Sequence, residues 1–186
     1  PIYDPREDSK LLEKYVWEYA KGSVLDIGTG SGIQALAAAK SKKVKSVLAT
    51  DIQSSVINYN KKNIINKKIK FIASDLFENV GNKKFDTIIF NPPYLPNELK
   101  VKDLTLEGGK KGYEVIERFL NDVNGFLKPD GVVLIVFSSL TKKEKVDEFI
   151  SKNLLEFELL GKQRIFFEEL YVYKIEQSSL LKTLEK

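Results

Sequence analysis

Short apolar runs alternate with stretches whose apolar residues recur at helical spacing, and this alternation extends along most of the chain. We expect strands at residues 23–27, 46–50, 69–74, 85–90, 131–137, 155–160 and 169–175, and helices at residues 9–19, 31–40, 54–65, 113–127 and 142–152. The first five strand segments are almost wholly apolar, which is typical of parallel strands buried on both faces. The last two could form an antiparallel hairpin at one edge. The pattern therefore predicts an α/β fold with a doubly wound, seven-stranded, mostly parallel sheet.

The length of 186 residues corresponds to one domain. We expect a single domain over residues 1–176, followed by a tail at residues 177–186. Leu180, Leu181 and Leu184 in this tail have helical spacing, which fits either a docked helix or a frayed end. No apolar run reaches the roughly 18 residues that a membrane span needs, and no signal peptide is evident, so we expect a cytoplasmic protein.

A glycine-rich turn follows the first predicted strand. Gly28, Gly30 and Gly32 stand at alternate positions, which lets the backbone turn sharply and approach a ligand closely. A dinucleotide fingerprint would need a glycine where Ile33 stands, and the Gly-Lys-Ser/Thr ending of a P-loop is absent. The carboxylate of Asp26 would also repel a phosphate, whereas it would attract an ammonium group. The turn therefore favours a nucleoside that carries an amino acid.

Acidic residues close the next two predicted strands. Asp51 lies where a strand-end carboxylate can accept hydrogen bonds from both ribose hydroxyls, although it could instead cap the helix that begins near Ser54. Asp75 offers an acceptor for an adenine amino group, with Leu76 behind it to flank the base; a simple strand-end turn is the alternative. Because the carboxyl ends of parallel strands share one edge of a sheet, we expect these residues to meet there.

The sharpest motif is Asn91-Pro92-Pro93-Tyr94, directly after the predicted strand 85–90. The prolines have no N–H group, so the carbonyls of Asn91 and Pro92 stay available as acceptors. With the Asn91 side-chain oxygen they can accept both hydrogens of an amide or exocyclic amine, while Tyr94 offers a flat face for the same group. A rigid Pro-Pro turn is the alternative. The motif favours chemistry on a planar nitrogen.

The chain has no histidine and no cysteine. It therefore offers no disulfide, thiol nucleophile, Ser-His-Asp triad or Cys/His zinc site, and we expect no metal. The formal net charge is +4, and lysines cluster at residues 40–45 and 61–70, among other places. These clusters could contact nucleic acid. They have acidic neighbours and no interleaved aromatic residues, so a solvated surface is the better-supported interpretation.

Together these motifs resemble those of class I S-adenosylmethionine-dependent methyltransferases that act on planar nitrogens. Within that superfamily the chain resembles the HemK-like glutamine methyltransferases, especially the short archaeal and eukaryotic branch. Residues 3–9, 108–119 and 163–173 carry the narrower match. Two departures are that Ser9 stands where the branch has threonine, and that the chain lacks the N-terminal helical domain of the bacterial relatives.

The resemblance implies S-adenosylmethionine as methyl donor, S-adenosylhomocysteine as product, and the glutamine of a Gly-Gly-Gln motif in a peptide release factor as acceptor. Residues 1–22 would close over the cofactor. The implied cofactor-binding residues are Glu7, Asp8, Ser9, Asp26, Gly28, Thr29, Gly30, Gly32, Asp51, Ile52, Asp75, Leu76 and Asn91. The implied catalytic residues are Asn91, Pro92 and Tyr94, and the substrate-binding residues add Pro93, Gly108 and Gly109. Ser9 or Asp8 is also expected to cap the first helix.

Members of the branch commonly bind a small zinc-containing activator subunit. The predicted strand 69–74 lies at a sheet edge and would expose Phe71 or Ile72, which suits addition of a partner strand; a homodimer is an alternative use of this edge.

Three other functions stay open at this point. An adenine N6-methyltransferase would use the same acceptor geometry, but too little chain remains for a target-recognition domain. A lysine methyltransferase would need a base, and none is evident. A non-catalytic cofactor-binding module is the third, although Asn91 and Tyr94 are both intact.

Overall fold

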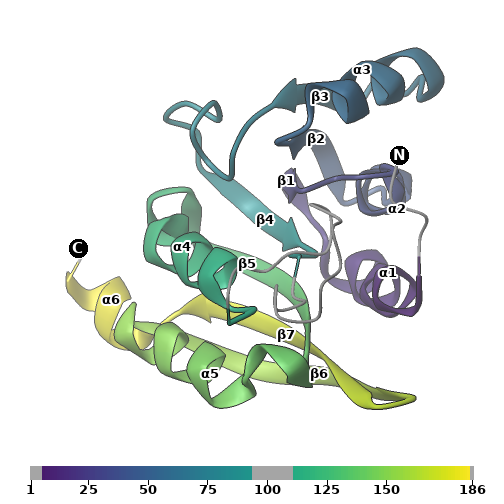
Figure 1. Ribbon diagram of the computed structural model, residues 1–186. Helices are drawn as coiled ribbons and strands as arrows, with labels where there is room; N and C mark the ends of the chain where they lie inside the picture. The colour runs from purple at the N-terminus through teal and green to yellow at the C-terminus, as the bar shows by residue number, and fades with distance from the viewer. Residues whose placement is uncertain (1–5, 94–110, 185–186) are drawn as a thin grey trace.

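Seven strands pair into one sheet within the residues that the computed structural model describes, 6–93 and 111–184 (Figure 1). They are β1 Gly22–Ile27, β2 Val44–Asp51, β3 Ile69–Ala73, β4 Phe85–Phe90, β5 Leu127–Ser138, β6 Leu155–Ile165 and β7 Glu168–Gln177. Their order across the sheet is β3-β2-β1-β4-β5-β7-β6. Strands β1 to β5 are parallel, whereas β7 is antiparallel to β5 and β6. The predicted α/β fold is confirmed, and the strand order reverses between β1 and β4.

Helices cover both faces of the sheet, because its central strands are apolar on both sides. They are α1 Glu7–Tyr19, α2 Ile33–Lys40, α3 Ser54–Asn63, α4 Glu114–Asp122, α5 Lys143–Lys152 and α6 Ser179–Leu184, with short 3-10 turns η2 Val123–Gly125 and η3 Ser139–Thr141. One core cluster packs Leu12, Ala38 and Ile57 of α1, α2 and α3 against the sheet. The other packs Phe119 of α4 and Ile150 of α5 against the opposite face. Two buried layers therefore hold the strand ends in fixed positions.

Several predicted boundaries are wrong for local reasons. Helix α1 begins at Glu7 after Arg6 at the N-cap, so Asp8 and Ser9 lie buried in its first turn and do not cap it. Helix α2 begins only at Ile33, because Gly32 has a φ of 81° and interrupts the helical backbone. The predicted helix 113–127 ends early. Its apolar spacing continues past Asp122, but Leu127 already belongs to β5 and pairs with Phe85 of β4.

The C-terminal hairpin is longer than predicted. Strand β6 continues to Ile165, and β7 begins at Glu168. A register shift between Leu159 and Gly161 changes the side-chain alternation in the middle of β6. The periodic signal in the sequence therefore stops there, although the strand continues.

Strand β3 lies at the sheet edge, as predicted. Of the two residues expected at this edge, Phe71 or Ile72, Phe71 is not available, because it belongs to a core cluster and is only 6% exposed. Ile72 is half-buried. The edge therefore offers backbone groups and Ile72 to a partner, and the Phe71 ring is committed to the core.

The tail forms helix α6 directly after β7. The Ser178 N–H donates to the Leu154 carbonyl at 3.0 Å, and the Ser178 hydroxyl accepts from the Leu181 N–H at 3.2 Å. Leu180 and Leu184 stay exposed, and Gln177 still belongs to β7. No helix in the described ranges is long and apolar enough to cross a membrane.

Candidate active site

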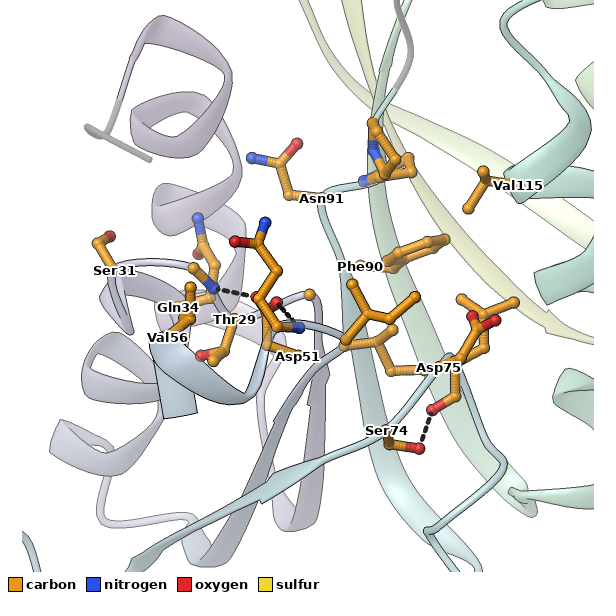
Figure 2. Close-up of a pocket in the computed structure, with 18 of the residues that line it drawn as sticks. Thr29, Ser31, Gln34, Asp51, Val56, Ser74, Asp75, Phe90, Asn91 and Val115 are labelled. Atoms are coloured by element: carbon orange, nitrogen blue, oxygen red, sulfur yellow. Dashed lines mark hydrogen bonds between the residues drawn. The ribbon is translucent and has the colours of Figure 1, made fainter. Parts of the chain in front are cut away.

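A cavity of about 240 Å³ lies at the carboxyl ends of β1, β2 and β4, beside the reversal of strand order (Figure 2). Ligands of open α/β sheets bind at such a position. The cavity wall includes the predicted site residues Asp8, Ser9, Gly28, Thr29, Gly30, Asp51, Ile52, Asp75, Leu76, Asn91, Pro92 and Pro93. Tyr94, Gly108 and Gly109 lie outside the described residues. The fold therefore gathers most of the predicted positions around one space.

Three other predicted residues do not line this cavity. Glu7 is exposed in the first turn of α1. Gly32 lies beneath the turn, where an added Cβ would come within 2.6 Å of the Ile64 side chain. Asp26 is only 1% exposed and lies below Thr29. These positions shape or flank the glycine turn.

The glycine turn depends on backbone that a side chain would strain. Gly28 and Gly30 have φ angles of 65° and 50°, in the left-handed region that favours glycine. The carboxylate of Asp51 accepts from the Gly30 N–H and from the Gln53 N–H, both at 3.0 Å. Helix α3 has Gln53 as its N-cap and no side-chain cap, so the interpretation of Asp51 as a helix cap is wrong. Asp51 instead ties the turn to the end of β2.

Two carboxyl groups, Asp26 near the glycine turn and Asp51 in the cavity wall, have raised pKa values. Burial raises the pKa of Asp26 to about 7, against the opposing effect of the hydrogen bond from Thr29 Oγ1 at 2.7 Å. Burial also raises the pKa of Asp51, which the hydrogen bonds from Gln53 and Gly30 oppose. Carboxyl groups with shifted pKa values are typical of functional clefts, although they also occur in structural hydrogen-bond networks.

The side chain of Asn91 is held from α1. Its Nδ2 donates to Ser9 Oγ at 3.1 Å, and Gln34 Nε2 donates to the Ser9 carbonyl at 2.8 Å. These contacts connect α2, α1 and the end of β4. Because Nδ2 is engaged by Ser9, the Oδ1 atom of Asn91 is oriented as the acceptor that remains for a ligand.

The third strand end is shaped by a strained turn and an ion pair. Leu76 has a φ of 45°, and its carbonyl accepts from Ser74 Oγ at 3.0 Å. Asp75 Oδ2 lies 2.9 Å from Nη2 of Arg118, which comes from α4. The pair is partly exposed, so its contribution to stability is small. Its effect at the site is to hold one oxygen of Asp75 and to bring α4 to the cavity.

Sequence reasoning missed Ser31, Gln34, Val115 and Arg118 in the cavity wall. Gln34 carried a signal, because it is a polar residue among the alanines of α2 and is buried there. The sequence around Arg118 gave no such signal, since its partner Asp75 is 43 residues away.

The strand order and the position of this cavity match the Rossmann-like architecture of methyltransferases. Residues 7–167 match the family model described as methyltransferase small domain, and the chain belongs to that family.

A relative from Methanocaldococcus jannaschii, which carries the provisional name protein N5-glutamine methyltransferase, is 38% identical over 92% of this chain and 89% of its own length. The release factor glutamine methyltransferase of Streptococcus pneumoniae is 32% identical over 81% of this chain and 58% of its own length. The chain thus spans little more than half of that bacterial relative. The Mtq2–Trm112 complex of E. cuniculi, described as responsible for methylating the termination factor eRF1, matches with a TM-score of 0.77, 23% identity and coverage of 95% of this chain and 99% of the other. At that identity the match supports the fold.

The methyltransferase fold implies S-adenosylmethionine as methyl donor, and the cavity fits such a ligand. Ser31 Oγ and Gln34 Oε1 are buried at the cavity wall without a hydrogen-bond partner among the described residues. Buried polar atoms normally have partners, so these two suit a polar ligand end. Ile52 and Leu76 supply apolar surface elsewhere in the wall. The wall therefore suits a molecule with a polar amino-acid end and an apolar base.

Proposed function

We propose that this chain transfers a methyl group from S-adenosylmethionine to the side-chain amide nitrogen of a glutamine, in the Gly-Gly-Gln motif of a peptide release factor. The observation that carries the proposal is the orientation of Asn91, whose Nδ2 donates to Ser9 and whose Oδ1 is left as an acceptor. The names of the similar proteins support the same acceptor.

Asn91 and Pro92 would hold the acceptor amide by its two N–H groups. The Asn91 side chain is oriented by Ser9, so it presents its oxygen without first reorganising. Accepting both N–H bonds would keep the amide plane fixed and stabilise the positive charge that develops on nitrogen as the C–N bond forms. The methylated nitrogen would then release one of its two protons to water. Both Pro92 and Pro93 lack an N–H that could compete for the same acceptors. Tyr94 would stack on the amide plane.

The cofactor would be held along the carboxyl ends of three strands. Asp51 would accept the ribose hydroxyls, and Asp75 would accept the adenine amino group with Leu76 and Ile52 against the base. Gln34 Oε1 and Ser31 Oγ would meet the amino-acid end, close to Asp8 and the glycine turn. Asp26 supports the turn through Thr29. When bound, the cofactor supplies the electrophilic methyl group.

A small zinc-binding activator subunit is the partner that we propose for the β3 edge. The structurally similar Mtq2 is found in a complex with Trm112, which supports a partner of this kind. Strand β3 pairs only with β2 in the described sheet, so its outer backbone groups can pair with an added strand.

Transfer of labelled methyl from S-adenosylmethionine tests the proposed acceptor. The acceptors are a release-factor domain, its Gln→Ala variant in the Gly-Gly-Gln motif, and an adenine-containing oligonucleotide, each with and without the activator. We expect label on the wild-type protein alone. Label on the oligonucleotide alone would assign the adenine function instead, and label on the Gln→Ala variant would place the acceptor elsewhere in the protein.

A further inference from the structure

The β6–β7 hairpin extends beyond the rest of the sheet. The last residue of β5, Ser138, pairs with Leu170, and the hairpin then continues through two more pairs, Arg164 with Glu169 and Ile165 with Glu168. Phe166 and Phe167 join the two strands at the tip. From Leu170 to Phe167 the chain advances three residues, which corresponds to about 10 Å beyond the end of β5. In Figure 1 this tip projects at the lower right.

The base of this overhang is held in place. The Glu169 N–H donates to Ser139 Oγ at 3.0 Å, and Ser138 Oγ donates to the carboxylate of Glu168. Further back along β6, Tyr15 of α1 donates its hydroxyl to the Leu160 carbonyl at 2.9 Å. Side chains from β5, η3 and α1 thus fix the direction in which the hairpin projects.

The tip exposes two aromatic rings that do not contribute to the core. Phe166 is 89% exposed and Phe167 is fully exposed, and Phe166 has a φ of 39°, which a bulky residue rarely adopts. Burying a phenylalanine stabilises a fold by about 1.5–3 kcal/mol, and neither ring gains that here. Glycine or asparagine would suit such a turn better. Neighbouring exposed aromatic side chains are typical of contact surfaces for a protein partner.

The location of the tip indicates which kind of partner it contacts. Strand β5 runs parallel to β4 with Ile135 beside Phe90, and β7 is antiparallel to β5, with Tyr173 opposite Ile135. The first residues of β7 therefore lie at the carboxyl edge of the sheet, where Asn91 and the cavity lie. Phe167 lies six residues before Tyr173, which corresponds to about 20 Å along the strand. A peptide of a few residues held at Asn91 could not span this distance, whereas a folded protein domain could.

We infer that Phe166 and Phe167 form a docking contact for the protein that bears the acceptor glutamine, away from the reacting atoms. This inference rests on the proposed function. The tip would add contact area at the side of the cavity mouth, where a substrate domain must approach. It would therefore determine affinity for the whole protein and leave the methyl-transfer step itself unchanged.

The test compares Phe166→Ala/Phe167→Ala with the control Leu180→Ala/Leu184→Ala, which removes two exposed apolar side chains from α6 at the opposite side of the molecule. Both variants and the wild type, each with its activator, are assayed with an intact release-factor domain. For the tip variant we expect KM to rise at least tenfold, with kcat and cofactor affinity unchanged. The control variant should match the wild type.

Each outcome separates this inference from the proposed function. Failure of the wild type to methylate the domain would refute the proposed function. If the wild type methylates it and the tip variant keeps the wild-type KM, the docking inference is refuted. A tenfold fall in kcat with an unchanged KM would also refute the docking inference, because the tip would then act on the chemical step. If the wild type sediments as a dimer and the tip variant as a monomer, the tip binds a second copy of the chain instead.

Discussion

Replacing Ser9 by alanine removes the hydroxyl that orients Asn91. Ser9 Oγ accepts from Asn91 Nδ2 at 3.1 Å and has no role in capping α1. Without it the Asn91 amide can rotate, and its oxygen is no longer directed at the acceptor in every molecule. We therefore expect Ser9→Ala to lower kcat, with the fold and the cofactor site retained.

The size of the effect follows from the loss of one neutral hydrogen bond. Such a bond contributes about 1 kcal/mol net, which corresponds to roughly fivefold in kcat. Asn91 is only half-buried, so water can satisfy its Nδ2 in the variant. The free energy of unfolding should consequently change by less than about 1 kcal/mol, since no buried donor is left unpaired.

Steady-state kinetics with a release-factor domain and calorimetric titration of S-adenosylmethionine measure the two effects separately. Ser9→Thr is the matched control, because it keeps the hydroxyl, and it should retain most of the activity. A kcat equal to that of the wild type in Ser9→Ala would refute the orienting role. A rise in the cofactor Kd with kcat unchanged would instead assign Ser9 to the cofactor.

Three more substitutions test other parts of the site. Asn91→Ala should lower kcat by a factor of about 10² or more with the cofactor Kd nearly unchanged, because it removes an acceptor used in the transition state. Equal losses of turnover and cofactor affinity would contradict that role. Asp51→Ala should weaken cofactor binding by roughly 1.5–3 kcal/mol in calorimetric titration, since charge-assisted bonds are lost, and an unaltered Kd would remove Asp51 from the ribose site. Asp26→Asn tests the buried carboxyl in the cofactor-free protein. The folded pKa of about 7 lies above the ordinary aspartate pKa of 3.8, so the contribution of Asp26 to stability is present below about pH 4 and is lost as the pH rises through 7. The loss is on the order of 4 kcal/mol. Denaturant unfolding from pH 4 to 8 should show this fall in the free energy of unfolding in the wild type and not in Asp26→Asn. If the free energy of unfolding changes with pH in the same way in both proteins, the raised pKa of Asp26 is contradicted.

The strands and the glycine turn could be predicted because their signals are local. An apolar run between polar segments specifies a buried strand, and Gly28 and Gly30 follow directly from the backbone that the turn requires. The place of Asn91, Pro92 and Asp51 in the cavity wall could be predicted because each lies at or directly after the end of a strand, at the same sheet edge.

The parts that could not be predicted depend on contacts between distant segments. Arg118 meets Asp75 only because the segment after β3 packs against α4, where the Phe77 ring stacks on Phe119. The bond from Asn91 to Ser9 joins residues 82 positions apart, and the length of the hairpin depends on pairing after the shift at Gly161. Asp26 was expected to face the ligand. Whether a strand-end carboxylate lines a cavity or lies beneath it depends on how deeply the turn packs, which no local pattern encodes.

Glutamine methylation is tested by fragmentation mass spectrometry of the Gly-Gly-Gln peptide from a release-factor domain, after incubation with the wild type or with Asn91→Ala. We expect one added methyl group on the glutamine side-chain amide with the wild type, and almost none with Asn91→Ala in the same time. A methyl group on any other residue, or equal modification by both proteins, would contradict the claim that Asn91 holds a glutamine amide for methyl transfer.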